Sequence, residues 1–202
     1  MARKTGSHSD STRPKVRAAA ERLFAEKGYG AVSMRQIASE VGVQAGALYL
    51  YTPDKQTLLF DLLQSHMQDV LDGWAAEDKS GGPCQQLETF TRFHIRFHSM
   101  RRDAVFISYM ELRNLTPKNF AQLERMRRKY ENALEAILIH GQRDRVFDVA
   151  DTKLTTLALI SMLNGVLSWY KPDGRLSLEK VEAIYSEMAG KAVRKANLAT
   201  VV

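Results

Sequence analysis

The stretch SMRQIASEVGVQAGALYLY, residues 33–51, contains two short helical patterns separated by a glycine. Ser33 and Gln36 have the spacing of a capping box, in which the serine hydroxyl accepts from the third backbone N–H of a helix and the glutamine reaches back to the cap. Gly42 ends this helix, and a second short helix follows that ends near Tyr51. Two short helices joined by a turn that contains glycine are typical of a helix-turn-helix unit, and the sequence therefore predicts one here.

Small residues crowd the second of these helices, which in a helix-turn-helix enters the major groove of DNA with its N-terminal residues at base edges. Small side chains allow the helix backbone to approach the bases, and a glutamine amide can pair with adenine through two hydrogen bonds. Tyrosine hydroxyls, and a lysine ammonium on the first turn of the next helix, can reach phosphate oxygens. The predicted DNA-contacting residues are Ser33, Arg35, Gln44, Ala45, Gly46, Tyr49, Tyr51 and Lys55. An ordinary helical hairpin is the alternative interpretation.

A basic segment precedes this unit along the chain. Residues 1–17 hold more lysine and arginine than acid, with Asp10 as the single carboxylate, and their glycine and serine content predicts a flexible basic arm over residues 1–12. The whole chain has a net charge of +6 and a pI of about 9.5, which favours a polyanionic partner without choosing among nucleic acid, phosphates and anionic lipid. For the arm, a terminus that only keeps the protein in solution is the alternative.

Apolar residues recur at helical spacing along the rest of the chain, and no convincing alternation typical of strands appears. Thr52 is expected to cap a long helix over residues 53–76, and five more helices follow a break at residues 79–83. The last two helices cover residues 151–170 and 177–195. The first of these is apolar nearly all round, so it needs packing partners on two sides.

The sequence therefore predicts an all-α protein. After the arm come a three-helix DNA-binding domain with the helix-turn-helix over residues 13–57 and a helical ligand-binding and dimerisation domain over residues 58–202. The single cysteine, Cys84, excludes a disulfide framework and indicates a reducing compartment. No stretch resembles a signal peptide, and the longest uncharged run, residues 154–170, is too short and too polar to span a bilayer. A cytoplasmic location without a membrane partner is expected.

Patterns for catalysis and metal binding are weak in this sequence. No phosphate-binding loop, serine nucleophile elbow or pair of catalytic carboxylates stands out. His94 and His98 have the spacing of two metal ligands on one helix, but no nearby cysteine or second pair completes a site. A place on a pocket wall or on the surface is the favoured interpretation for both. The sequence predicts no enzyme, no metal site and no cofactor.

Residues 19–59, AAERLFAEKGYGAVSMRQIASEVGVQAGALYLYTPDKQTLL, resemble the N-terminal DNA-binding domain of TetR-family repressors. The landmarks in order are "LF..KGY", then "IA..VGV..G.LY", then Lys55 followed by Leu58 and Leu59. The resemblance implies a homodimer whose subunits place their recognition helices in successive major grooves of a pseudo-palindromic operator in double-stranded DNA. Thr52 departs from the phenylalanine usual in the family, which affects packing under the recognition helix more than DNA contact.

The same resemblance implies that the second domain dimerises through the last two helices and holds a small-molecule pocket. Arg127 shares an apolar stripe with Leu123 and Tyr130, and an arginine on such a face either extends to water or meets a buried anion. The predicted pocket residues are Phe93, Phe97, Phe106, Tyr109, Met110, Arg127, Tyr130, Met162 and Trp169. Plain core packing is the alternative for the aromatic residues, and one larger monomeric core is the alternative to the dimer.

A second resemblance concerns residues 109–137 and residues 161–181, SMLNGVLSWYKPDGRLSLEKV. They are similar to the TetR subgroup that senses CoA thioesters in fatty-acid, steroid or aromatic-acid catabolism. The implied effector is an acyl-CoA, with its acyl group in the apolar cavity and its phosphates on basic side chains. The stretch HGQRDRVFDV, residues 140–149, departs from this subgroup because it lacks the usual second glycine.

The prediction is thus a ligand-responsive transcriptional repressor that an acyl-CoA releases from DNA. A rival within the class is a multidrug-type sensor of cationic amphiphiles, which needs carboxylates in the pocket, and Glu111 is the only obvious candidate. A rival from another class is a helical acyl-CoA-binding protein or enzyme that acquired a basic arm. That protein would bind the thioester without preferring any DNA sequence.

Overall fold

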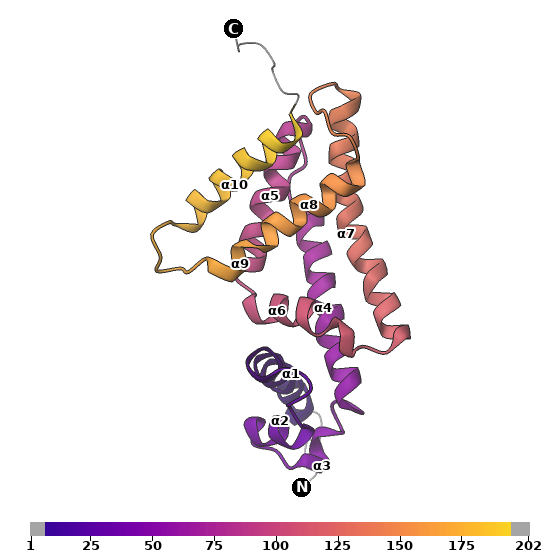
Figure 1. Cartoon of the computed structure of the whole chain (residues 1–202). Coiled ribbons are helices and arrows are strands. Elements are labelled where there is room, and N and C mark those ends of the chain that lie inside the picture. Colours follow the sequence, from indigo (N-terminus) through magenta and orange to yellow (C-terminus); the bar gives the residue numbers. More distant parts are fainter. Residues whose placement is uncertain (1–6, 195–202) are drawn as a thin grey trace. The chain divides into compact units, whose positions relative to one another are not determined.

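The computed structural model describes residues 7–194, and every regular element in that range is helical, which confirms the predicted all-α class (Figure 1). No helix in this part of the chain is long and apolar enough to cross a lipid bilayer. The chain divides into two compact units, of which the first contains the described residues up to Asp69 together with Arg101–Arg125. The second contains Val70–Met100 and the described residues from Met126 onward. These are packing units, so the functional boundary after residue 57 stays a prediction.

Helix α1, Ser7–Lys27, begins within the segment predicted to be a basic arm. Residues 1–6 of that arm lie outside the described residues, whereas residues 7–12 form the first turns of α1. No glycine interrupts residues 7–27, and Pro14 removes one backbone donor without ending the helix. The apolar face of α1 forms part of the core through Val16, Ala20, Leu23 and Phe24.

The helix-turn-helix follows, as α2, Met34–Val41, and α3, Ala45–Leu48. Ser33 caps α2, its side chain accepting from the backbone N–H of Gln36 while the Gln36 side chain accepts from the backbone N–H of Ser33, which confirms the predicted capping box. Gly42 has φ of 75°, a left-handed conformation that residues with a β-carbon rarely adopt. The glycine therefore ends α2 and turns the chain toward α3.

Helix α4, Lys55–Ala76, begins two residues later than predicted and has a different cap. The Oδ1 of Asp54 accepts from the backbone N–H of Thr57 at 2.7 Å, so Asp54 rather than Thr52 serves as the N-cap. Thr52 is buried, and its hydroxyl donates to the carbonyl oxygen of Asp54 at 3.1 Å. This hydrogen bond stabilises the turn before α4. Thr52 stands at the position where the family usually has phenylalanine.

The first unit also contains α6, Arg102–Met110, the short 3-10 helix η1, Leu112–Asn114, and the start of α7, Pro117–Arg143. Helix α6 packs against α1. Its buried positions repeat every three or four residues, as expected for one helix face. They are Ala104, Ile107 and Ser108, with the buried Val105 beside them, and the pattern continues to the buried Glu111 just beyond the helix end.

The second unit brings together α5, Pro83–Ser99, and α10, Leu178–Val193, which pack along one another (Figure 1). Glu182 of α10 is buried and lies 3.4 Å from the guanidinium of Arg96 and 3.8 Å from that of Arg92, both on α5. The remainder of the predicted last helix, at Lys195, lies outside the described residues.

The predicted single helix over residues 151–170 is divided into α8, Thr152–Asn164, and α9, Val166–Trp169. Asp151 caps the first of them as its position suggests, through a hydrogen bond of 2.8 Å from the backbone N–H of Leu154 to its carboxylate. The break falls at Gly165, whose lack of a side chain disfavours a continuous helix.

Candidate DNA-binding and effector sites

Helix α3 presents a polar and aromatic face to solvent. Leu48 is fully buried and anchors the helix, whereas Gln44, Gly46 and Tyr49 are exposed. Gln44 stands at the N-cap position with an extended backbone, and its side chain makes no capping hydrogen bond, so its amide is not used within the helix. Ala45 and Tyr51 are half-buried beside them. The structure therefore leaves the predicted residues of this helix at least partly accessible to a partner.

The start of α2 lies on the other side of the helix-turn-helix. Arg35 is exposed, as a phosphate contact requires. Ser33 is also exposed, but its hydroxyl donates to the Gln36 side-chain oxygen at 2.9 Å and accepts from the Gln36 backbone. Ser33 thus has a structural task in the cap besides the DNA contact predicted for it.

Lys55 has contacts that the sequence pattern does not predict. Its ammonium donates to the carbonyl oxygens of Tyr29 and Val32, at 2.8 Å each, and stands 4.2 Å from the centre of the Tyr29 ring. These bonds join the first turn of α4 to the loop between α1 and α2. An ammonium carries three N–H donors, so two carbonyl bonds leave a third for a phosphate oxygen.

Glu111, the carboxylate named for the cationic-amphiphile alternative, lies in the first unit and makes hydrogen bonds that the sequence pattern does not predict. Its side chain is buried, and its Oε1 accepts from the backbone N–H of Tyr29 at 3.0 Å. Its Oε2 accepts from the side-chain amide of Asn114 at 2.5 Å. The recognisable pattern is its spacing from Ala104, Ile107 and Ser108, which continues the buried face of α6.

Three predicted effector residues of the second unit, Phe93, Phe97 and Tyr130, share an aromatic cluster. The ring centre of Phe93 lies 5.2 Å from that of Phe97 and 6.5 Å from that of Tyr130. The cluster also contains Trp74 and Phe90, which the sequence prediction did not include. Phe93 and Tyr130 are buried, which fits plain core as well as a cavity wall. Two further members of the predicted set, Arg127 and Met162, are half-buried.

The predicted effector residues of the first unit all lie on α6. Phe106, Tyr109 and Met110 are exposed by 47%, 40% and 51%. Their spacing of three and four residues places them together on the face opposite to the one that packs against α1. The structure therefore brings these three side chains to a common surface of the first unit.

A buried polar network crosses the second unit at His94. Its Nδ1 lies 3.1 Å from the Tyr130 hydroxyl and its Nε2 3.0 Å from the side-chain oxygen of Asn164. The His98 ring stacks on it with centres 4.1 Å apart. Burial first, and the neighbouring His98 second, hold the pKa of His94 well below its usual value. His94 is therefore a neutral hydrogen-bonding residue of the core, and sequence reasoning missed it because both partners are distant in the chain.

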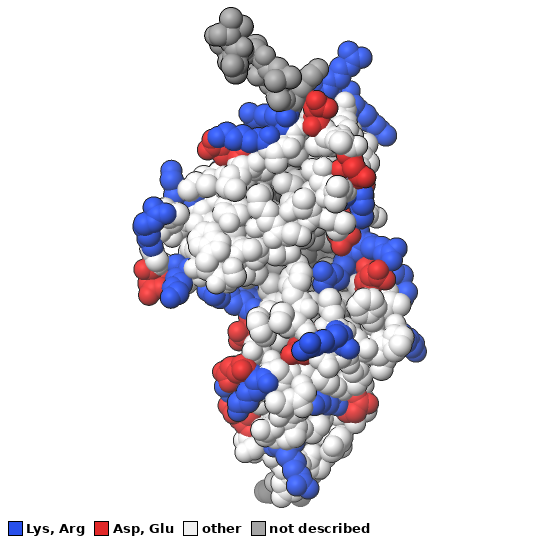
Figure 2. Space-filling view, in the orientation of Figure 1, with Lys and Arg blue, Asp and Glu red and all other residues white. Residues whose placement is uncertain are grey.

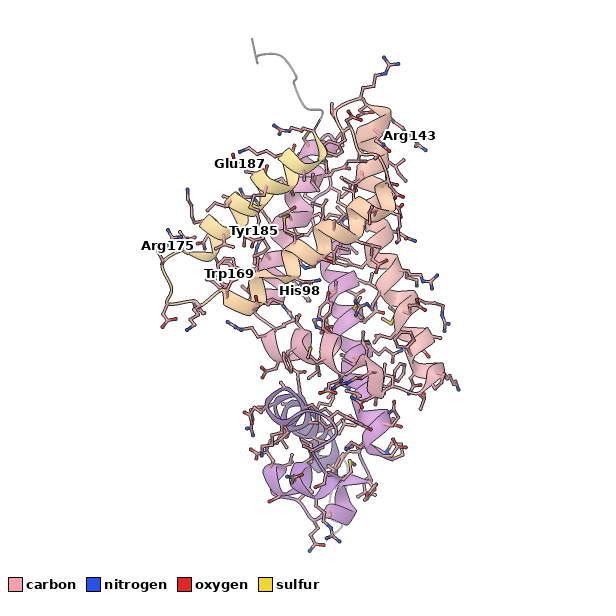
Figure 3. The ribbon with its side chains drawn as sticks, viewed as in Figure 1. His98, Arg143, Trp169, Arg175, Tyr185 and Glu187 are labelled. Carbon is pink, nitrogen blue, oxygen red and sulfur yellow. The ribbon has the colours of Figure 1, made fainter. Side chains whose placement is uncertain are left out.

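Surface cavities lie in the second unit, and two of them are formed by described residues near α9 and α10. One of about 210 Å³ is formed at the end of α9 and in the loop that leads to α10, and Figure 3 shows Arg175 on this loop and Trp169 beside Tyr185. Its lining residues are Trp169, Tyr170, Lys171, Gly174, Arg175 and Leu176. Two cations and an indole ring thus surround it, and Trp169 belongs to the predicted effector set. The other, of about 220 Å³, lies between α5 and α10 and contains none of the predicted residues.

Comparison with known proteins finds matches in both the N-terminal and the C-terminal part of the chain. Residues 16–62 match the family described as "Bacterial regulatory proteins, tetR family", and residues 80–193 match "Tetracyclin repressor-like, C-terminal domain". The chain is 25% identical over 167 residues to the HTH-type transcriptional repressor KstR2 of Rhodococcus jostii (strain RHA1), with 81% of each chain covered.

Solved structures agree with these matches. A bacterial regulatory protein in the tetR family from Rhodococcus RHA1 superposes with a TM-score of 0.85 at 27% identity, over 92% of this chain and 98% of that one. AibR, in complex with isovaleryl coenzyme A and operator DNA, superposes with a TM-score of 0.78 at 24% identity, over 88% of this chain and 97% of that one. The likeness to AibR shows a common fold.

Proposed function

The chain belongs to the TetR family of bacterial regulatory proteins, and we propose that it represses transcription as a dimer on a pseudo-palindromic operator and leaves it when a CoA thioester binds. Its family consists of DNA-binding regulators, which makes it a regulator and not an enzyme. The observation that carries the proposal is the exposure of α3. Gln44, Gly46 and Tyr49 are open to solvent, while the buried Leu48 anchors the helix to the core.

In this proposal α3 enters the major groove and Gln44 reads a base edge. Tyr49 and the third N–H of Lys55 contact phosphate oxygens, which fix the position of the helix without reading the sequence. Arg35, at the start of α2, binds the phosphates on the other side of the groove. Contacts of both kinds are needed, since phosphate contacts supply affinity and base contacts supply specificity.

The proposed dimer interface is formed by α8, α9 and α10. Leu154 and Leu157 of α8 are exposed by 66% and 42%, and Ala158 and Ser161 continue the same helix face. Figure 2 shows a broad surface of this face with few charged side chains in its middle and lysine, arginine and acidic residues at its margins. A large exposed apolar surface with a polar rim is typical of a protein interface.

A CoA thioester is the effector class that the side chains favour. We assign the acyl chain to the apolar aromatic cluster around Phe93 and Tyr130, and the phosphate groups to the cavity at Trp169, which Lys171 and Arg175 line. AibR, which shares the fold, was solved with isovaleryl coenzyme A, and this supports the same class here. The cationic-amphiphile alternative is disfavoured, because Tyr29 and Asn114 already occupy both oxygens of Glu111.

The proposed mechanism is a shift between two arrangements of the dimer. Recognition helices must repeat at about 34–36 Å to enter successive major grooves. In a second arrangement of the dimer the recognition helices have a different spacing and do not fit successive grooves. An effector that binds this second arrangement more tightly than the DNA-binding one shifts the population toward it, and the dimer dissociates from DNA. Helices α4 and α7 each contribute to both packing units, and α4, which begins next to the helix-turn-helix, is the element proposed to carry this change.

The test begins with genome-wide selection of DNA fragments that bind the protein, followed by fluorescence anisotropy on the selected site at fixed salt. Isovaleryl-CoA, hexanoyl-CoA and palmitoyl-CoA are then added, with free CoA and the free acids as controls. Sequence-specific binding that only the thioesters reverse is the expected result. Specific binding that no thioester reverses would remove the effector class and retain the repressor. Thioester binding without any DNA sequence preference would favour the acyl-CoA-binding alternative.

A further inference from the structure

Helix α6 has one buried face and one exposed face. The face formed by Ala104, Ile107 and Ser108 is buried and packs against α1, and Glu111 continues it. The opposite face carries the exposed candidate effector residues Phe106, Tyr109 and Met110. Because Met110 and Glu111 are neighbours in the chain, a displacement of the effector face also moves the Glu111 carboxylate.

Glu111 holds the backbone of Tyr29 from one side. Its Oε1 accepts from the Tyr29 N–H at 3.0 Å, and a hydrogen bond from Asn114 fixes its other oxygen. A buried carboxylate is costly unless hydrogen bonds compensate for lost water, so a residue that only filled space here would be apolar. The contact therefore points to a positioning task.

Lys55 holds the same residue from the other side. Its ammonium lies 2.8 Å from the Tyr29 carbonyl oxygen and over the Tyr29 ring. Gln56 adds a second connection, since its side chain donates to the Asn114 carbonyl at 2.6 Å and accepts from the Thr116 backbone N–H at 3.2 Å. The segment after α6, the Tyr29 loop and the first turn of α4 thus form one hydrogen-bonded network.

We propose that Glu111 is a positioning residue for DNA binding, which acts through Tyr29 to hold Lys55 in place for its phosphate. This inference rests on the proposed function, since it concerns how the DNA-contacting residues are placed. It also assigns a route: α6 controls the helix-turn-helix through the Glu111–Tyr29–Lys55 connection. No contact between Glu111 and DNA is required.

The experiment is a double-mutant cycle on the selected operator, measured by anisotropy at several salt concentrations. Glu111→Gln retains an acceptor for the Tyr29 N–H and should bind within about twofold of the parent protein. Glu111→Met has a similar volume but no acceptor, and should weaken binding about 5- to 20-fold while lowering the salt slope by about one. Lys55→Met should give the same loss, and the double variant should be no more than about twofold weaker than Lys55→Met, since residues acting through one network are not additive.

Two results would overturn the proposal. One is an unchanged salt slope in Glu111→Met, which would reduce Glu111 to a residue needed for stability alone. The other is multiplication of the two single losses in the double variant, which would mean that the residues act independently. If circular dichroism shows that Glu111→Met does not fold, Asn114→Ala takes its place in the cycle. Asn114→Ala should weaken DNA binding less than Glu111→Met would, and its effect should likewise not add to that of Lys55→Met.

Failure of the proposed function has a different outcome. If the parent protein prefers no DNA sequence, the proposed repressor function is refuted. The Glu111–Tyr29–Lys55 connection can then still be tested without DNA, by amide hydrogen exchange of the protein alone. Exchange at Tyr29 should rise about tenfold or more in Glu111→Met, and also rise in Lys55→Met, because either change loosens the same loop. Unchanged exchange at Tyr29 in Lys55→Met would refute the connection independently of DNA.

Discussion

The Nδ1 atom of His94 lies 3.1 Å from the hydroxyl oxygen of Tyr130, and this bond joins α5 to α7 inside an aromatic cluster. The ring has a second partner, Asn164, at the last residue of α8. Three helices of the second unit therefore meet at one neutral imidazole.

The first prediction concerns acid stability. The pKa of His94 is lowered by burial and by His98, so the folded protein binds fewer protons at this residue than the unfolded chain does. The free energy of unfolding should therefore fall as the pH drops below the ordinary imidazole pKa of about 6.5, by at most about 1.4 kcal/mol per pH unit for this group. His94→Gln should make that fall smaller in urea titrations between pH 7 and pH 5. Parallel losses in the parent and His94→Gln would contradict the prediction.

Gln44 should determine which operator is preferred. Gln44→Ala removes a side chain that can make two hydrogen bonds to adenine, at a cost of about 1–3 kcal/mol in discrimination at one base-pair position. Binding to the parent operator should weaken, whereas binding to an operator changed at that position should weaken little. Lys55→Met provides the contrast, because loss of a phosphate contact should weaken binding to both operators equally. An equal loss on both operators for Gln44→Ala would show that this residue reads no base.

Arg145 occupies a backbone conformation that suits glycine. Its φ is 59°, in the left-handed region, and it stands in the stretch where the CoA-sensing subgroup usually has a second glycine. The left-handed conformation costs a residue with a β-carbon about 1–2 kcal/mol, against about 0.5–1 kcal/mol for the greater freedom of glycine in the unfolded chain. Arg145→Gly should therefore raise the free energy of unfolding by about 0.5–1 kcal/mol in denaturant titrations. Arg145→Ala keeps the β-carbon and should give no such gain, so an equal gain would assign the effect to charge.

Leu157 tests the proposed dimer. A glutamate at this exposed position of α8 would have to be buried without a partner in the interface, which is strongly unfavourable. Leu157→Glu should be a monomer in size-exclusion chromatography with light scattering and should bind the operator far more weakly than the parent protein. Val146→Glu is the matched control, since Val146 is 41% exposed but lies in the loop after α7. A dimeric Leu157→Glu would move the interface elsewhere.

Local features of the fold were predictable from the sequence. The capping box at Ser33 and Gln36, the end of α2 at Gly42 and the cap at Asp151 each depend on residues within a few positions of one another. The cap of α4 shows the limit, because Thr52 and Asp54 are both suitable caps and only burial of Thr52 selects Asp54. In the same way, nothing near Gly6 indicates that α1 begins at Ser7.

Contacts between distant residues were not predictable. Glu111 and Tyr29 are separated by 82 positions, and His94 and Asn164 by 70. Each side chain taken alone fits a pocket as well as a core, so one sequence gives no physical ground for pairing them. The exposed polar residues of α3 were predictable because their positions follow from the turn that precedes them.

Trp169 gives the protein an intrinsic optical probe. It is one of two tryptophans, and the other, Trp74, is only 7% exposed and packs within the aromatic cluster, whereas Trp169 is 48% exposed beside Tyr185 and lines the basic cavity. In the monomeric Leu157→Glu protein, iodide in solution should therefore quench the emission of Trp169 and spare that of Trp74. A Trp74→Phe protein would emit from α9 alone, so occupancy of that cavity could be followed in real time without attaching a dye.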